Sequence, residues 1–160
     1  MPALRLVLDT NVLLAGIASE SSASQRIVDL LQRRKAIPLL SPAVLAEYRA
    51  VLTNPKIVQK FPELTARRTA VVLSRLCYIG DEFGDFRLKF RFPRDPLDAK
   101  FIELAIVGNA THIITLDEDL LSLTTATSDA GRRLKHRLPK LEIVRPGKFL
   151  SDHAAALELE

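Results

Sequence analysis

The sequence predicts an α/β fold, a three-layer α/β/α sandwich around a central and mostly parallel sheet. Short apolar runs rich in Val, Ile and Leu alternate with longer segments of helical period, which is typical of βαβ units. The chain has 160 residues, 48% of them hydrophobic and 26% charged, which is the size and composition of one globular domain. We assign residues 1–150 to this domain. Residues 151–160 are expected to form a tail that is poorly ordered or partly added for protein expression.

The first half of the chain predicts two strands, each followed by helix. Leu4–Leu8 is a short β-rich run that stops at Asp9. Ser41 and Pro42 follow the second run, as an N-cap and a first helical residue would. The elements expected are a strand over 4–8, a helix beginning just after residue 9, an amphipathic helix over 24–35, a strand over 36–40, a helix over 42–53 and a helix over about 63–77.

The second half predicts one strongly apolar helix and two further strands. Asp95-Pro96 opens the helix and Gly108-Asn109 closes it. The elements expected are a loop over 80–93 with at most a short strand, a helix over 97–107, a strand over 112–116, an irregular basic segment over 123–140, a strand over 141–144 and a last helical turn over 146–150.

Composition excludes several classes of protein. The single cysteine, Cys77, rules out an internal disulfide framework and a zinc site built from several thiolates. No apolar run is long enough to cross a membrane, so a cytoplasmic protein without a membrane partner is expected. The net charge of +4 permits a polyanionic partner and does not by itself indicate one.

Two acids follow directly after predicted strands. Asp9 ends the run 4–8, and Asp117 ends the run 112–116. Because the carboxyl ends of parallel strands share one edge of the sheet, where ligands bind, both carboxylates are expected at that edge. The alternative for either residue alone is a helix N-cap, which is equally compatible with its position.

Two more acids lie near the start of helices that begin at the same edge. Glu47 follows Val44 and Leu45, and Asp98 lies in the first turn of the 97–107 helix. Singly, Glu47 could be a solvated neighbour of Arg49, and Asp98 a first-turn acid that complements the helix dipole. Four converging carboxylates would repel one another unless cations intervene. We expect these carboxylates to bind one or two Mg²⁺ or Mn²⁺ ions, because both metals prefer oxygen ligands and bind phosphate.

Such a cluster predicts phosphodiester hydrolysis. Metal ions held by carboxylates lower the pKa of a bound water and neutralise the leaving oxygen. The three histidines, His112, His136 and His153, are scattered along the chain and are not expected to be catalytic. The residues therefore favour phosphate chemistry over redox work or acyl transfer.

Four ordered segments resemble those of PIN-domain ribonucleases, in particular the putative toxins of type II toxin–antitoxin (VapC-like) modules. The resemblance spans roughly residues 4 to 121, with a similar ending at 143–150. The segments are Leu8–Leu14, Ser41–Glu47, Arg94–Ala105 and Thr115–Leu121.

This resemblance implies a PIN-like sandwich, Mg²⁺ or Mn²⁺ dependence, cleavage of RNA, a homodimer and an inhibitory antitoxin protein. It gives the catalytic and metal-binding roles to Asp9, Glu47, Asp98 and Asp117. Asp119 is a further, weaker candidate for the metal. Asn11, Thr115 and Asp95 would support the carboxylates, although Asp95 is equally suited to cap the helix before Pro96.

Other readings stay open. The basic residues Arg132, Arg133, Lys135 and Arg137 either bind the RNA backbone or form a solvated loop. The chain could be a non-catalytic RNA-binding or assembly module, because fold does not guarantee activity. A structure-specific DNA nuclease is a weaker alternative. A haloacid-dehalogenase-like phosphatase is disfavoured because Asn11 stands where that family needs a second acid.

Overall fold

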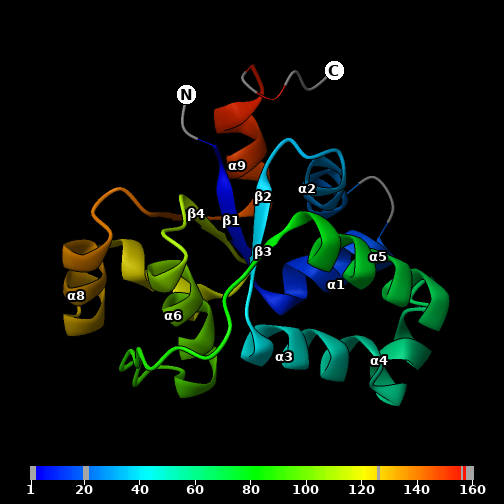
Figure 1. The fold of residues 1–160 in the computed structure, drawn as a ribbon, viewed down its shortest axis with the longest axis horizontal. Helices are drawn as coiled ribbons and strands as arrows, with labels where there is room; N and C mark the ends of the chain where they lie inside the picture. The colour runs from blue at the N-terminus through cyan, green and yellow to red at the C-terminus, as the bar shows by residue number, and fades with distance from the viewer. Residues whose placement is uncertain (1–2, 20–21, 126, 156, 158–160) are drawn as a thin grey trace.

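The computed structural model describes residues 3–19, 22–125, 127–155 and 157, and it confirms the α/β class. Within these ranges five strands form one sheet in the order β3-β2-β1-β4-β5, and every neighbouring pair is parallel. The sheet stands in the middle of the molecule (Figure 1). The strands are β1 (Arg5–Leu8), β2 (Ile37–Leu40), β3 (Asp81–Glu82), β4 (His112–Ile114) and β5 (Glu142–Val144).

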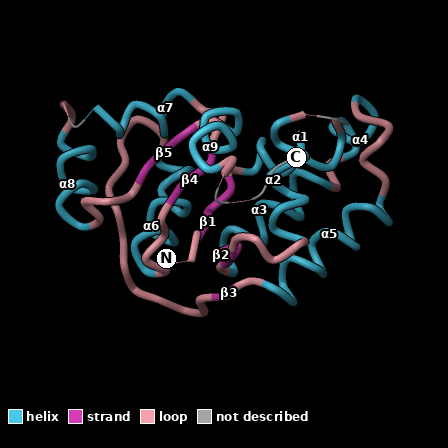
Figure 2. The backbone as a smooth tube through the Cα atoms, turned by 90° about the horizontal axis from the view of Figure 1, so that it is seen from above, coloured by secondary structure: helices cyan, strands magenta, loops and turns pink. Residues whose placement is uncertain are grey.

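Helices cover both faces of the sheet. Figure 2 shows the strands as a strip between α6 on one side and α2 and α9 on the other. The helices are α1 (Thr10–Ala18), α2 (Ala23–Gln32), α3 (Pro42–Leu52), α4 (Pro55–Lys60), α5 (Ala66–Ile79), α6 (Ala99–Val107), α7 (Glu118–Leu121), α8 (Asp129–Arg137) and α9 (Pro146–His153), with 3-10 turns η1 (Pro96–Asp98) and η2 (Ser122–Thr125). None of the described helices is long and apolar enough to cross a membrane.

The register of β1 and β4 decides what meets at the carboxyl edge of the sheet. Leu8 is the partner of Ile114, and the N–H of Asp9 donates to the carbonyl of Ile114 at 3.0 Å. The residues that follow the two strands, Asp9 and Thr115, therefore start side by side. After their first residues, Arg5 and His112, both strands are apolar and buried, so the core fixes their register and not the polar residues beyond them.

Capping residues set the start of the helices that reach this edge. The hydroxyl of Ser41 accepts the N–H of Val44 at 3.2 Å, and Pro42 is the first residue of α3, as predicted. Asn54 and Pro55 end α3, also as predicted, but they begin a further short helix, α4, that the sequence analysis did not expect. The side chain of Asn54 caps that helix, which is the other common use of an Asn-Pro pair.

The segment 123–140 is not irregular, and the prediction for it was wrong. It contains η2 and the helix α8, which Ser128 caps by accepting the N–H of Gly131 at 3.0 Å. Only two apolar side chains of α8, those of Ala130 and Leu134, are buried in the core, and Gly131 lies inside the helix. Basic residues fill most other positions, so the helical period was hidden. Residue 126 lies outside the described residues.

Two other elements differ in their bounds. The helix expected over 97–107 begins as the 3-10 turn η1, and its α-helical part starts at Ala99. The last helix, α9, continues to His153, three residues beyond the predicted turn, and Leu157 beyond it is buried. The loop predicted over 80–93 does contain the short strand β3.

Candidate functional site

A cleft opens at the carboxyl edge of the sheet, between the ends of β1 and β4 and the starts of α3 and α6. Its volume is about 710 Å³. Two apolar side chains, Leu97 and Leu116, are exposed at its border. The lining includes all four acids predicted as catalytic and three of the weaker candidates, namely Asp9, Glu47, Asp98, Asp117, Asp95, Asp119 and Asn11.

Asp9 is a buried carboxylate and not a helix cap. It occupies the N-cap position of α1, but its side chain makes no capping hydrogen bond. Its Oδ2 instead accepts the hydroxyl of Thr115 at 2.8 Å, and the residue is only 5% exposed. Burial raises the pKa of Asp9, the bond from Thr115 lowers it, and the negative charges of Asp117 and Glu47 raise it again.

Thr115 joins the two strand-end acids. Its hydroxyl is fully buried, donates to Asp9 and accepts the backbone N–H of Asp117 at 2.9 Å. Asp117 does act as a cap, because its Oδ1 accepts the N–H of Asp119 at 3.1 Å at the start of α7. Both readings of Asp117, cap and cluster member, are therefore compatible with its position.

Glu47 points inward from α3 and is not a solvated neighbour of Arg49. Its Oε2 accepts the hydroxyl of Thr10, and its Oε1 pairs with the ammonium of Lys100 at 2.5 Å. Lys100 lies on α6, so this ion pair joins α3 and α6. In the arrangement described here, Lys100 is the positive charge nearest to Glu47.

Asp98 is partly buried among other acids. Burial above all, and then a side-chain interaction with Asp117 and the charges of Asp9, Asp95 and Asp117, raise its pKa to about 8. The neutral form of Asp98 is thereby favoured, as is usual for crowded carboxyl groups.

The acids fall into two groups whose oxygens are close enough to ligate an ion. One oxygen each from Asp9, Glu47 and Asp98 lies within 4.8 Å of the others, and the same holds for Asp95, Asp117 and Asp119. The donor set is all oxygen, which suits Mg²⁺ or Mn²⁺. Burial, and to a lesser extent the neighbouring negative charges, raise the pKa values of Asp9 and Asp98, and a bound cation would offset both effects. The residues present therefore fit a divalent cation.

The weaker candidates take more ordinary positions. Asp95 caps η1 by accepting the N–H of Leu97 at 3.2 Å, as its alternative reading predicted. Asp119 forms an ion pair with Arg94, whose Nε lies 2.6 Å from Oδ1. Asn11 is exposed and lines the cleft.

Two residues with clear contacts at the site were missed. Lys100 holds Glu47, and Tyr48 donates its buried hydroxyl to the carbonyl of Leu8 at 2.5 Å, just before Asp9. Burial, and then the charges of Asp9 and Glu47, raise the pKa of Tyr48 far above its usual range, so the hydroxyl stays a donor. A lysine at the start of an otherwise apolar helix, and a tyrosine beside the helical acid, were the available signals.

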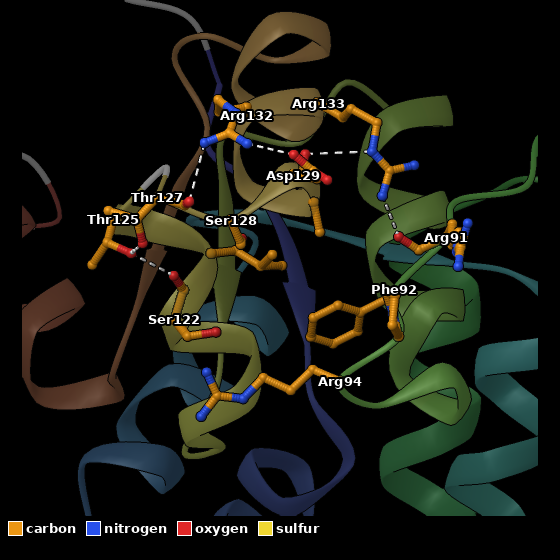
Figure 3. A pocket seen from close by; sticks show the side chains of 13 residues that line it. Arg91, Phe92, Arg94, Ser122, Thr125, Thr127, Ser128, Asp129, Arg132 and Arg133 are labelled. Carbon is orange, nitrogen blue, oxygen red and sulfur yellow. Dashed lines mark hydrogen bonds and ion pairs between the residues drawn. The ribbon is translucent and has the colours of Figure 1, made fainter.

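A second hollow, of about 740 Å³, adjoins the acid cleft and is basic. It lies between the 91–94 segment and α8, and Arg132 and Arg133 of α8 flank Asp129 at its upper border (Figure 3). Arg94 lines this basic pocket and pairs with Asp119 of the acid cleft, so the two hollows share a wall.

The four predicted basic residues are therefore separated by the fold. Arg132 and Arg133 line the basic pocket, whereas Lys135 lines a different hollow beside β5, and Arg137 is exposed in the last turn of α8. The two arginines of the basic pocket also contact other groups of the protein. Arg132 pairs with Asp129, and Arg133 donates to the carbonyl of Arg91 at 2.7 Å.

The chain is similar in sequence to a known domain family and to known proteins. The sequence profile described as a PIN domain matches residues 5–119, which include every acid of the cleft. An uncharacterized protein of Methanocaldococcus jannaschii is 27% identical over 149 residues, 93% of this chain and 91% of that protein. Among solved structures, VapBC2 from Rickettsia felis bound to a DNA fragment from their promoter is similar over 89% of this chain and 98% of the matched chain, at 14% identity and a TM-score of 0.49.

Proposed function

Because the chain belongs to the PIN-domain family, whose members are generally nucleases, we propose that it is a metal-dependent endoribonuclease. The observation that carries this is the convergence of acids from four separate segments on one edge of the sheet, with raised pKa values for Asp9 and Asp98. Binding RNA does not require converging carboxylates, and their mutual repulsion destabilises the protein unless a cation is present.

The first acid group would hold the ion. Asp9, Glu47 and Asp98 supply one oxygen each, and Asp117 lies within reach of Asp98. When bound, a divalent cation supplies positive charge for the scissile phosphate and acidity for the attacking water. Thr115 holds the carboxylate of Asp9 in orientation, whereas Lys100 neutralises that of Glu47 and would compete with the ion for it. Asp98 would bind the ion as a carboxylate.

The charge around the cleft favours a nucleic acid substrate, and the resemblance of the four ordered segments favours RNA. The basic pocket continues the acid cleft through the Arg94–Asp119 pair, so a nucleic acid strand with its scissile phosphate at the acids would extend toward Arg132 and Arg133. Those side chains would neutralise phosphates without reading sequence. The exposed Leu97 and Leu116 offer apolar surface on which an unstacked base of a single strand could rest.

The cellular role we propose is that of a cytoplasmic VapC-like toxin with a cognate antitoxin protein. The support is the sequence resemblance of the four ordered segments to that subgroup. A short reading frame upstream that encodes a DNA-binding protein would support it, and co-expression of that protein should abolish cleavage. We also propose a homodimer, which sedimentation of the purified chain tests.

The substrate class is tested with matched oligonucleotides. The purified chain is incubated with a single-stranded RNA, its hairpin form and the DNA of the same sequence, in Mg²⁺, Mn²⁺ or EDTA. Internal cleavage of the single-stranded RNA in metal and not in EDTA supports the proposal. Cleavage of the DNA alone would favour the alternative of a structure-specific DNA nuclease. Tight RNA binding without cleavage under every condition would favour a non-catalytic module.

A further inference from the structure

Three side chains gather at the amino-terminal edge of the sheet, at the opposite end from the acid cleft. His112 is the first residue of β4, Glu142 the first residue of β5, and His153 the last residue of α9. The histidines are scattered along the sequence, but the expectation that they lie apart was wrong for His112 and His153. They lie 41 positions apart in the chain, yet α9 runs back along the sheet and brings them together.

The distances within this group, the His112–Glu142–His153 cluster, match those of a metal site. Nε2 of His112 lies 3.1 Å from Nε2 of His153 and 3.2 Å from Oε2 of Glu142. In a tetrahedral zinc site with bonds of 2.0–2.1 Å, neighbouring ligand atoms are about 3.3 Å apart. Each of the three residues offers a ligand atom within 4.8 Å of the others.

The two ring nitrogens of His112 face different partners. Nδ1 lies 2.9 Å from the hydroxyl of Thr111, which also lies 3.0 Å from the carbonyl of Arg5, and Nε2 faces Glu142 and His153. When the hydroxyl donates to Arg5 it accepts from Nδ1–H, and the lone pair of Nε2 is then free for a ligand. A donated Nδ1–H that leaves Nε2 free is the arrangement of metal-binding histidines.

The packing around the cluster holds its rings in place and leaves one side open. Phe149 packs against both rings, at 5.0 Å from His112 and 4.7 Å from His153 between ring centroids. The nearby Lys148 is paired with Asp152 at 2.9 Å. The side chain of Glu142 is 55% exposed, so an ion can enter from its side and keep a water there.

We propose that His112, Glu142 and His153 bind one divalent transition-metal ion, with Zn²⁺ preferred, which fastens α9 to β4 and β5. Two imidazoles and one carboxylate suit Zn²⁺ and disfavour Mg²⁺, which takes oxygen ligands. The site is separate from the acid cleft and its role is structural. It does not depend on the nuclease proposal.

The test uses the untagged chain in excess Mg²⁺, so that the acid cleft is supplied with its own ion. Calorimetry with Zn²⁺ and thermal unfolding with and without Zn²⁺ are measured for wild type, Glu142→Gln, His153→Ala and His136→Ala. His136 is exposed on α8 and outside the cluster, so its variant is the matched control. Glu142→Gln changes an exposed side chain, and the folded state should tolerate it.

We expect wild type and His136→Ala to bind one Zn²⁺ and to unfold at higher temperature with Zn²⁺. Glu142→Gln and His153→Ala should bind at least about 10-fold more weakly and lose the thermal shift. Co²⁺ should give the visible absorption of a tetrahedral site in wild type and in His136→Ala. It should not do so in Glu142→Gln or His153→Ala. Equal Zn²⁺ affinity in all four proteins, or no Zn²⁺ binding by wild type, would overturn the proposal and leave an ordinary histidine pair.

Discussion

The hydroxyl of Thr115 donates to Oδ2 of Asp9 at 2.8 Å, across two neighbouring strands that end at the same level of the sheet. Its oxygen also accepts the N–H of Asp117 at 2.9 Å, so the direction of both bonds is fixed. Thr115 therefore orients one acid of the cleft through its side chain and the other through its backbone. The register of β1 and β4 places Asp9 beside Thr115 directly after the strands, so no loop is needed to bring them together.

Replacing Thr115 with valine keeps the shape of the side chain and removes both bonds. The folded state then contains a buried carboxylate and a buried N–H without this partner, which we expect to lower the free energy of unfolding by about 1–3 kcal/mol. The pKa of Asp9 should rise further, moving the pH profile of cleavage to higher pH. Urea denaturation and a pH–rate profile measure the two effects. Thr115→Ser should stay close to wild type, and equal behaviour of the two variants would contradict the role of the hydroxyl.

The stability of the metal-free chain should fall as the pH rises from about 4 to about 8. The pKa of Asp98 is raised to about 8 in the folded chain from 3.8, so the folded state binds more protons than the unfolded state in this window. By linkage, raising the pH then favours unfolding. Thermal unfolding in EDTA across this range checks the direction.

Asp98→Asn should flatten that pH dependence, because asparagine does not titrate. Asp85→Asn, at an exposed loop position, serves as the control and should keep the wild-type slope. Mg²⁺ should reduce the slope in wild type, since an ion that binds the carboxylates displaces the proton. A slope that is the same in wild type and Asp98→Asn would show that another group is responsible.

The Lys100→Met variant should be less stable than wild type without metal. It should also bind Mn²⁺ more tightly than wild type does. Methionine keeps the apolar stem of the side chain but removes the charge that neutralises Glu47. Without this charge the acids repel one another more strongly, and a divalent cation meets no competing ammonium. Calorimetry gives the affinity, and Lys100→Arg should preserve wild-type behaviour. Weaker Mn²⁺ binding by Lys100→Met would mean that the lysine assists the ion and does not compete with it.

The double variant Arg132→Gln, Arg133→Gln should weaken RNA binding about equally for all sequences. If each arginine neutralises one phosphate, the slope of log affinity against log salt should decrease by about 0.7 for each on a single strand. Fluorescence anisotropy in Ca²⁺, at several salt concentrations, measures this without demanding cleavage. Arg67→Gln, on the exposed surface of α5, is the control. An unchanged salt slope in the double variant would place the RNA elsewhere.

The sequence indicated the parts of the site that depend on topology. Asp9 and Asp117 could be placed at one edge because each ends an apolar run, and parallel strands end together. Glu47 and Asp98 followed because their helices begin at that edge. The sheet and most helix bounds were predictable for the same reason, since buried strands and capped helices leave a strong pattern.

What could not be predicted depends on side-chain geometry between distant segments. The Lys100–Glu47 pair, the contact of Tyr48 with Leu8 and the interaction of Asp98 with Asp117 join residues whose spacing in the chain follows no helix or strand period. The helix α8 was missed because so few of its residues reach the core. His112 and His153 were missed as neighbours because α9 was expected to end before His153.

The most direct test of the proposed nuclease is the Mn²⁺ dependence of single-stranded RNA cleavage by wild type and Asp9→Asn. Asparagine keeps the size of the side chain and an acceptor for Thr115 but removes the charge that would hold the ion. We predict metal-dependent cleavage by wild type and a loss on the order of 100-fold or more in the variant at every Mn²⁺ concentration, because a bound ion contributes several kcal/mol to the transition state. Cleavage by Asp9→Asn at the wild-type rate, or by wild type in EDTA, would contradict the account.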